Sequence, residues 1–422
     1  MRVLVTLVFT FLSLFAFDAT LEVVKETQKL PKVRVENITA NPSDRELGDK
    51  IAAMTVGDLK VTGHFDAYLP EEDMTALGES VDYVDLKQKG VDLLIRLEAQ
   101  EAFGEAQARF KVYDINARQE SLSGEYSVQE SARYPFLAHR VAIAVNSYIG
   151  APTVDWMGKF VVLAKRKDQK QSDIVISDYT LTYQKTLIEG GVNIFPKWAD
   201  DSQKEIYFTT LDRKPTLYKL NIYTGKREKI LDSQGMIVCS DVNAKGDKLL
   251  LTMAKYDDQT DLFLYDIPTG GLKRVTDFPG IDVGGNFIDD DTRAAFVSDR
   301  LGNPNIFAVD FDSQRVEQMV YHGKNNVSLS AHKNYIAYSS RESNNEFGRN
   351  TFNLYLISTQ SSFIRRLTAE GVNEFPRFSS DGDSVLFIKN LQHESALGII
   401  RLNYNKSFIF PLESGEIQSI DW

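Results

Sequence analysis

The chain of 422 residues is too long for one ordinary hydrophobic core, so it predicts two domains, or one large repeat array with a smaller domain. Hydrophobic residues make up 43% of the chain and charged residues 25%, which is typical of a folded protein and argues against disorder. The formal net charge of −11 gives no reason to expect a nucleic acid as partner.

The first 17 residues predict a signal peptide, because Arg2 precedes an apolar run from Val3 to Phe17. The run is too short to span a membrane comfortably, and a buried core segment is the less favoured alternative. No clear pattern marks the cleavage site. We therefore expect an exported, soluble protein, and Cys239, its only cysteine, leaves it without an internal disulfide.

Residues 18–31 predict an N-terminal arm, in which Leu21 and Val23 alternate as in a strand but too few apolar residues are present for independent folding. A small α/β domain follows at residues 32–150. It contains a helix that begins at Ser43, where Ser43 and Glu46 match a capping box, and that ends at Gly57 or Gly63. The other expected elements are strands at 32–38, 91–97, 106–115 and 120–128 and a helix at 132–149.

Residues 151–422 contain a repeat in which a short apolar strand, a tight turn and further strands recur. The apolar residue before the turn, here called the anchor, recurs at steps of 42 to 49 residues, at Trp198, Val242, Phe287, Leu329, Phe378 and Trp422. This period with several short strands is typical of a β-propeller blade, so we predict six blades. The array starts at Phe160 with a strand of the kind that follows the turn, and it ends with an inner strand at 417–422. The last strand should therefore complete the first blade, which would combine three strands from the start of the array with one from its end.

The search for catalytic chemistry finds no nucleophile elbow, zinc motif, phosphate loop or dinucleotide fingerprint. His139 lies among the apolar positions of a predicted helix and is interpreted as a structural histidine. Asp289-Asp290-Asp291 could bind calcium, but a solvated turn is favoured. Asp299-Arg300 is interpreted as a structural pair. No cofactor or metal site is predicted.

Two blade segments, Ser298–Phe307 and Arg366–Gly382, resemble the blade motifs of the TolB family, the periplasmic propellers of the Tol–Pal cell-envelope system. The resemblance covers the whole chain, from signal peptide and arm through the α/β domain to six blades. The family's Ser-Pro-Asp-Gly turn is replaced at Ala199, Asn243 and Asp289, which indicates a divergent member.

The resemblance implies a non-enzymatic periplasmic adaptor. It implies binding of the peptidoglycan-associated lipoprotein Pal at the propeller mouth and of TolA through the N-terminal region, with other outer-membrane proteins as further candidates. The implied roles are outer-membrane integrity and envelope constriction at cell division. The alternative from another class is a periplasmic propeller hydrolase or lyase that acts on a peptide or glycan.

Partner contacts are expected on the connectors that lead from the outer strand of one blade to the inner strand of the next, because six such connectors form a concave rim. The blade register places on this rim Asn193, Phe195, Met236, Cys239, Asp282, Val283, Asn325, Asn326, Glu374, Phe375 and Gln418. The resemblance points to Met236, Cys239 and Val283 for Pal, and to the arm with Leu21 and Val23 for TolA. The alternative for Cys239 and Val283 is that they face the blade core.

Overall fold

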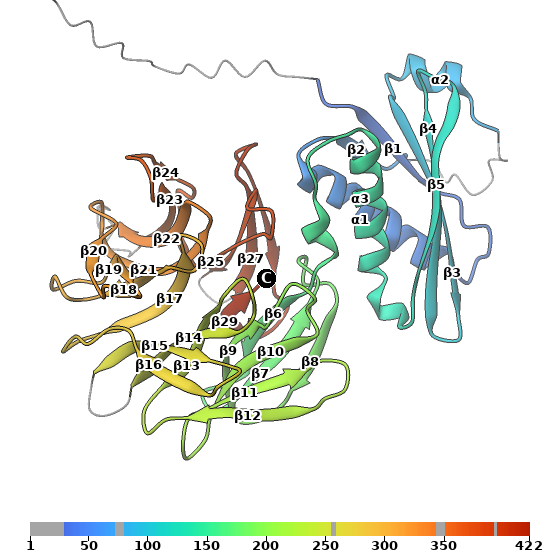
Figure 1. Ribbon diagram of the computed structural model, residues 1–422. Coiled ribbons are helices and arrows are strands. Elements are labelled where there is room, and N and C mark those ends of the chain that lie inside the picture. Colours follow the sequence, from blue (N-terminus) through green and yellow to red (C-terminus); the bar gives the residue numbers. More distant parts are fainter. Residues whose placement is uncertain (1–28, 72–79, 255–258, 343–350, 392–394) are drawn as a thin grey trace, which may run out of the picture. The chain divides into compact units, whose positions relative to one another are not determined.

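The computed structural model describes residues 29–71, 80–254, 259–342, 351–391 and 395–422 (Figure 1). The predicted signal peptide and nearly all of the predicted arm, including Leu21 and Val23, lie outside these residues. Pro31–Trp422 form one compact unit. In the described part of the chain, no helix is long and apolar enough to cross a membrane.

The first part of this unit contains a five-stranded mixed sheet. Its strands, in spatial order, are β2 (Asp66–Tyr68), β1 (Lys32–Asn37), β3 (Leu93–Ala102), β4 (Glu105–Asp114) and β5 (Gln119–Val128). β1 is parallel to both neighbours, whereas β3, β4 and β5 form antiparallel hairpins. The four predicted strands are confirmed, and the three-residue β2 is too short to show a pattern in the sequence.

Two helices, α1 (Arg45–Thr62) and α3 (Pro135–Tyr148), pack on one face of the sheet through their apolar stripes. α1 ends at Gly63, whose φ of 84° favours glycine, as predicted. The predicted capping box is wrong. The N-cap is Asp44, and the Ser43 hydroxyl donates to the Asp44 carboxylate, so it is not used to cap the helix.

The short helix α2 (Tyr83–Gln88) was not predicted. Its Leu86 belongs to a separate apolar cluster with Leu94 and Tyr113, which alternate with the residues that face α1 and α3. Two 3-10 turns, η1 (Ser131–Arg133) and η2 (Asp155–Gly158), flank α3 and lead into the second part of the unit.

The described strands from Val161 onward form six four-stranded blades arranged in a ring (Figure 1). Single parallel bridges at Ser172–Val192 and Phe352–Val372 join the first blade to the second and the fifth to the sixth. The inner strands of the blades surround a channel. From the channel outward, the first blade consists of β29 (Glu416–Asp421), β6 (Val161–Arg166), β7 (Ser172–Ser177) and β8 (Gln184–Ile188). The second consists of β9 (Val192–Trp198), β10 (Glu205–Leu211), β11 (Thr216–Asn221) and β12 (Arg227–Asp232). The third consists of β13 (Ile237–Val242), β14 (Lys248–Ala254), β15 (Thr260–Asp266) and β16 (Gly271–Arg274). The fourth blade consists of β17 (Asp282–Ile288), β18 (Arg293–Ser298), β19 (Asn305–Asp310) and β20 (Val316–Gln318). The fifth consists of β21 (Lys324–His332), β22 (Tyr335–Glu342), β23 (Thr351–Ser358) and β24 (Ile364–Arg366). The sixth consists of β25 (Val372–Phe378), β26 (Ser384–Asn390), β27 (Ser395–Arg401) and β28 (Lys406–Pro411).

The first blade combines strands from opposite ends of the array. β29 runs antiparallel to β6, with Ile420 opposite Leu163. Each inner strand contacts the inner strands of the two neighbouring blades, so β29 lies between β25 and β9. The strand order is the one that the sequence predicts, and the contribution of β29 to stability stays a prediction.

One anchor was placed wrongly in the sequence. Ala331 pairs with Ile336 as Phe378 pairs with Val385, so the fourth anchor is Ala331 and not Leu329. The reason is that β21 contains two register shifts, which lengthen it and displace its pattern. The step from Phe287 to Ala331 is then 44 residues, in line with the neighbouring steps.

Candidate functional site

The channel wall is made by the six inner strands, and each of them contains a β-bulge or register shift. Four of the six strands have residues of positive φ in these irregularities, at Phe195, Gly284, Asn325, Ser328 and Phe375. The irregular backbone turns N–H groups toward the next blade. The Phe375 N–H donates to the Ser328 hydroxyl (3.1 Å), and the Phe195 N–H donates to the Ser419 hydroxyl (3.2 Å). Positive φ is costly for Phe, so these two predicted rim residues occupy strained positions held by the neighbouring blade.

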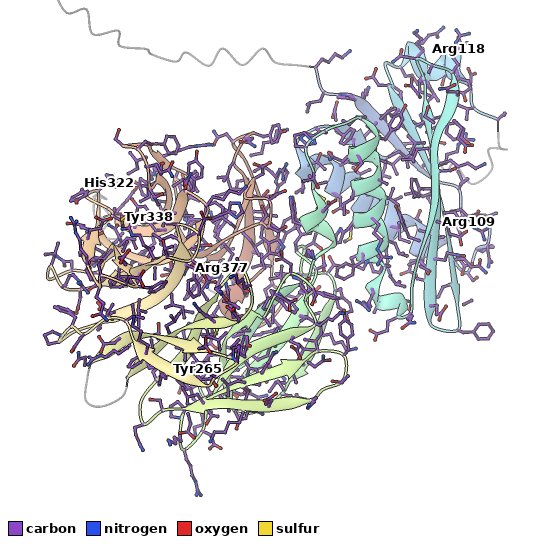
Figure 2. The ribbon with its side chains drawn as sticks, viewed as in Figure 1. Arg109, Arg118, Tyr265, His322, Tyr338 and Arg377 are labelled. Carbon is purple, nitrogen blue, oxygen red and sulfur yellow. The ribbon has the colours of Figure 1, made fainter. Side chains whose placement is uncertain are left out.

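A charged group lies in the channel near the ends of the inner strands. The Lys197 ammonium lies 3.0 Å from a carboxylate oxygen of Asp241 and 3.0 Å from one of Asp421, on the inner strands to either side. The Arg377 guanidinium lies 3.4 Å from Asp421, and Figure 2 shows Arg377 on the inner side of the blades. We call Lys197, Asp241, Arg377 and Asp421 the channel ion group. It contains two cations and two anions and joins the second, third, sixth and first blades.

The two carboxylates of the channel ion group also accept backbone hydrogen bonds. Asp421 accepts from the Trp198 N–H (2.8 Å), and Asp241 accepts from the Phe287 N–H (2.9 Å). Burial opposes the charged form of Lys197, but Asp241 and Asp421 outweigh burial and raise the pKa of the ammonium above its ordinary value. The Lys197 ammonium is therefore charged at neutral pH.

Sequence reasoning missed the channel ion group, although a signal was present. Lys197, Asp241, Arg377 and Asp421 each stand directly before an anchor residue. A polar residue that recurs at one position of a repeat, next to an apolar anchor, indicates a side chain that faces the channel.

A cavity of 650 Å³ opens at the end of the channel where the turns after the inner strands gather. It is lined by the channel ion group residues Lys197, Asp241 and Asp421, by the turns at 199–203 and 243–246, and by Trp156 and Lys159. The predicted rim residues do not line this cavity. The rim residues lie toward the beginning of the inner strands, whereas the residues that line the cavity lie at the end of these strands and in the turns after them.

Most of the predicted rim residues lie within inner strands rather than in connectors, because these strands begin earlier than predicted. Met236, one residue before β13, is the exception. Three of the side chains are buried and bonded within the chain. Asn193 donates to backbone carbonyls of Ser172 (3.1 Å) and Gly190 (2.8 Å), and Asn326 donates to the His322 carbonyl (2.9 Å).

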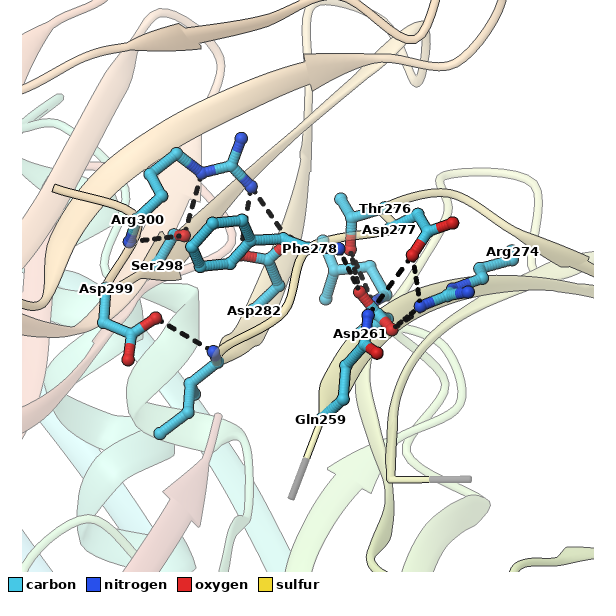
Figure 3. Close-up of polar contacts among 12 residues, drawn as sticks. Gln259, Asp261, Arg274, Thr276, Asp277, Phe278, Asp282, Ser298, Asp299 and Arg300 are labelled. Atoms are coloured by element: carbon cyan, nitrogen blue, oxygen red, sulfur yellow. Dashed lines mark hydrogen bonds and ion pairs between the residues drawn. The ribbon is translucent and has the colours of Figure 1, made fainter. Parts of the chain in front are cut away.

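The third of these buried side chains is Asp282, which pairs with Arg300 (Figure 3). The Arg300 guanidinium donates to both carboxylate oxygens (2.9 and 3.1 Å) and lies over the Phe278 ring. Asp299 instead accepts the Ile281 N–H (2.9 Å). Asp299 and Arg300 are thus structural, as predicted, but they do not bond to each other. Asp299 bonds to the connector before the inner strand of their blade, and Arg300 bonds to the inner strand itself. The buried side chains of Asn193, Asn326 and Asp282 shape the rim and are not exposed for a partner.

Cys239 is 3% exposed and packs in the apolar cluster of Tyr207, Ile237 and Leu251. Burial raises the pKa of its thiol well above the ordinary value, so the thiol is unreactive. Its expected place on the rim is wrong, because the alternation of β13 directs this side chain into the blade core.

The remaining rim residues are partly exposed: Phe195, Met236, Val283, Asn325, Glu374, Phe375 and Gln418. Val283 also packs against an apolar cluster. Burial raises the pKa of Glu374, although a hydrogen bond from Asn390 opposes the shift. Gln418 lines a second cavity of 340 Å³ with Arg166 and Ser172. These side chains form the surface that a partner could touch.

Within the described residues, no group of three or more His, Cys, Asp or Glu side chains could hold a metal ion. Asp289, Asp290 and Asp291 lie in a turn between β17 and β18, all with positive φ. Asp289 pairs with Arg293 (3.1 Å), and Asp291 accepts the Ala244 N–H (3.0 Å). This arrangement is the turn that the sequence analysis favours.

The fold and the channel define a two-domain propeller protein, in which a small α/β domain precedes six blades around an ion-paired channel. The family model described as TolB beta propeller domain matches residues 157–422, and that described as TolB amino-terminal domain matches residues 19–121. The chain belongs to the TolB family, and it is not an enzyme.

Relatives of the chain share its full length. The Tol-Pal system protein TolB of Wolinella succinogenes is 51% identical over 100% of both chains. That of Helicobacter hepaticus is 43% identical over 97% of both chains, and that of Campylobacter jejuni is 43% identical over 100% of both. The crystal structure of TolB from Acinetobacter baumannii has the same fold, with a TM-score of 0.75 at 20% identity over 93% of this chain and 96% of that one. The chain is thus a Tol–Pal system protein, and the alternative of a hydrolase or lyase is set aside.

Proposed function

We propose that this protein is a periplasmic adaptor of the Tol–Pal system, which binds Pal on the rim where the inner strands begin and TolA through the N-terminal arm. The observation that carries the proposal is the full-length similarity to proteins named Tol-Pal system protein TolB. The proposal includes export by a signal peptide at residues 1–17, and roles in outer-membrane integrity and in constriction at division.

The rim supports the proposal because it combines exposed contact groups with a rigid base. Met236 and Val283 present apolar surface on the third and fourth blades. Elsewhere on the rim, the Arg300–Asp282 pair of the fourth blade, Asn193 of the second and Asn326 of the fifth hold the backbone through buried hydrogen bonds. A preorganised surface of this kind loses little conformational entropy when it binds a partner.

Photo-crosslinking in intact cells tests the Pal part of the proposal. A photoreactive residue at Met236 should capture Pal, whereas one at Leu272, an exposed apolar position on outer strand β16 of the same blade, should not. Removal of the arm, residues 18–31, after the signal peptide should abolish capture of TolA and leave capture of Pal intact. Capture of neither protein by any variant would contradict the adaptor role.

A further inference from the structure

A buried group of ionisable side chains joins the α/β domain to the first blade. His139 of α3 places Nδ1 2.8 Å from a carboxylate oxygen of Asp58 in α1, and Nε2 3.4 Å from a carboxylate oxygen of Asp178, which directly follows β7. The three side chains are at most 1% exposed. We call Asp58, His139 and Asp178 the interdomain triad.

The neighbours of the triad donate hydrogen bonds to both of its carboxylates. Asp58 accepts from the Tyr179 hydroxyl, and Asp178 accepts from the backbone N–H groups of Thr180 (2.9 Å) and Tyr183 (2.7 Å). Burial and the Asp58 charge raise the pKa of Tyr179, so its hydroxyl stays a donor. These contacts come from α1 and from the connector after β7, which are the elements that supply the groups facing His139.

The charge of His139 is the one that can change. Burial favours the neutral imidazole, but Asp58 and Asp178 outweigh burial and raise the pKa of His139 to about 9. At neutral pH the triad is therefore an imidazolium between two carboxylates. Without the proton, two buried carboxylates would face one neutral ring, and a buried charge without its counter-charge is strongly unfavourable.

Between the same two parts, the Arg133 guanidinium also lies over the rings of Phe160 and Tyr183. The remaining polar contacts are uncharged or exposed. His64 Nε2 lies 2.6 Å from the hydroxyl of Tyr404, in the turn between β27 and β28. The pKa of His64 is lowered by its burial, so this contact is made by the neutral ring. The ion pair of Lys185 with Glu130 (3.1 Å) has both side chains 49% exposed and is expected to contribute little.

We infer that the interdomain triad is an electrostatic switch that determines whether the α/β domain is docked on the propeller. Each part has its own sheet, and one apolar cluster also runs from α1 and α3 to the first two blades. The buried charges of the triad are balanced only when α1, α3 and the connector after β7 meet. The inference goes beyond the adaptor role and does not depend on which partner binds.

The test measures docking in the full chain by limited proteolysis of the segment at 150–159, which links α3 to the propeller. His139→Gln keeps a polar side chain but removes the cation. At pH 7 we expect the segment to be cleaved at least tenfold faster in this variant than in the native chain, while the thermal transition of the propeller is unchanged. Glu130→Gln, which breaks the exposed pair between the same parts, is the matched control and should be cleaved at the native rate.

Two pH series complete the test. In the native chain, cleavage should accelerate as the pH rises through about 9, and His139→Gln should lack this step. In His139→Gln, acid should restore protection, because a protonated carboxylate no longer requires the lost cation. Native-rate cleavage of His139→Gln would overturn the inference. Loss of the propeller transition in that variant, or a native chain whose cleavage does not change between pH 7 and 10, would also overturn it.

Discussion

The Lys197 ammonium lies 3.0 Å from the carboxylate of Asp421, so a side chain of the second blade holds the strand that completes the first blade. The same ammonium contacts Asp241 of the third blade. One lysine thus connects three neighbouring inner strands, and because only 16% of its side chain is exposed, solvent screens the interaction weakly.

Replacement of Lys197 by Met should destabilise the protein by about 3 kcal/mol, because two carboxylates in the channel would lose their shared cation. Urea unfolding at pH 7 measures the loss. The control is Lys214→Met, which breaks the more exposed pair with Asp232 and should cost less than 1 kcal/mol. Equal losses in the two variants would contradict the role of the channel ion group.

Deletion of residues 417–422 should open or unfold the propeller, because it exposes the edge of β6 and the apolar face that Ile420 covers. Trp422→Ala should cost about 2–3 kcal/mol. The Trp422 ring packs against Trp156 (ring centroids 5.2 Å apart) but is partly exposed, so the loss falls below the 3–5 kcal/mol of a fully buried Trp. Thermal unfolding and protease resistance measure both changes, and Tyr223→Ala, at a residue 65% exposed, is the control. A truncated chain with native melting temperature would refute the closure.

The free energy of unfolding should depend on the pH through His139. Its folded-state pKa of about 9 lies above the ordinary value of 6.5, so its contribution is fully present below about pH 6.5 and is lost as the pH rises through about 9. The size is roughly 3 kcal/mol, at 1.36 kcal/mol per pKa unit. Urea unfolding at pH 6.5, 8 and 10 should show the decline in the native chain and a flatter profile in His139→Gln. Parallel profiles would show that His139 is not charged in the folded protein.

The predicted arm should exchange between a bound and a free state, because residues 18–30 contain few apolar side chains beside Leu21 and Val23. Hydrogen exchange should find weak protection from Thr20 to Lys29 in the isolated protein and a change in protection when Pal is added. Strong protection that does not depend on the partner would make the segment ordinary structure.

The strand pattern of the chain could be predicted because alternation and period are local properties of the sequence. Features that depend on several segments could not. Ser43 matches a capping motif but bonds to Asp44, and the two register shifts of β21 displaced the fourth anchor from Leu329 to Ala331. His139 was correctly interpreted as structural, yet its partners Asp58 and Asp178 lie 81 and 39 positions away, and only the fold brings them together.

The rim was predicted only in part, because it also depends on contacts between several segments. Counting from the turns gave the right strands, but the direction of a side chain depends on the irregularity in each strand. Cys239 therefore faces the core, and Asp282 is neutralised by Arg300, whereas Met236 and Val283 keep exposed surface.

The most direct test of the adaptor role is the affinity of purified Pal for the variants Met236→Glu and Val283→Glu, measured by calorimetry beside their melting temperatures. A carboxylate in an apolar contact should weaken binding by more than about 1 kcal/mol, while the melting temperature stays native. Leu272→Glu, the same substitution on the outer strand of the same blade as Met236, should bind Pal normally. Native affinity in both rim variants, or early melting that accounts for their weaker binding, would contradict the proposal that Pal binds at this rim.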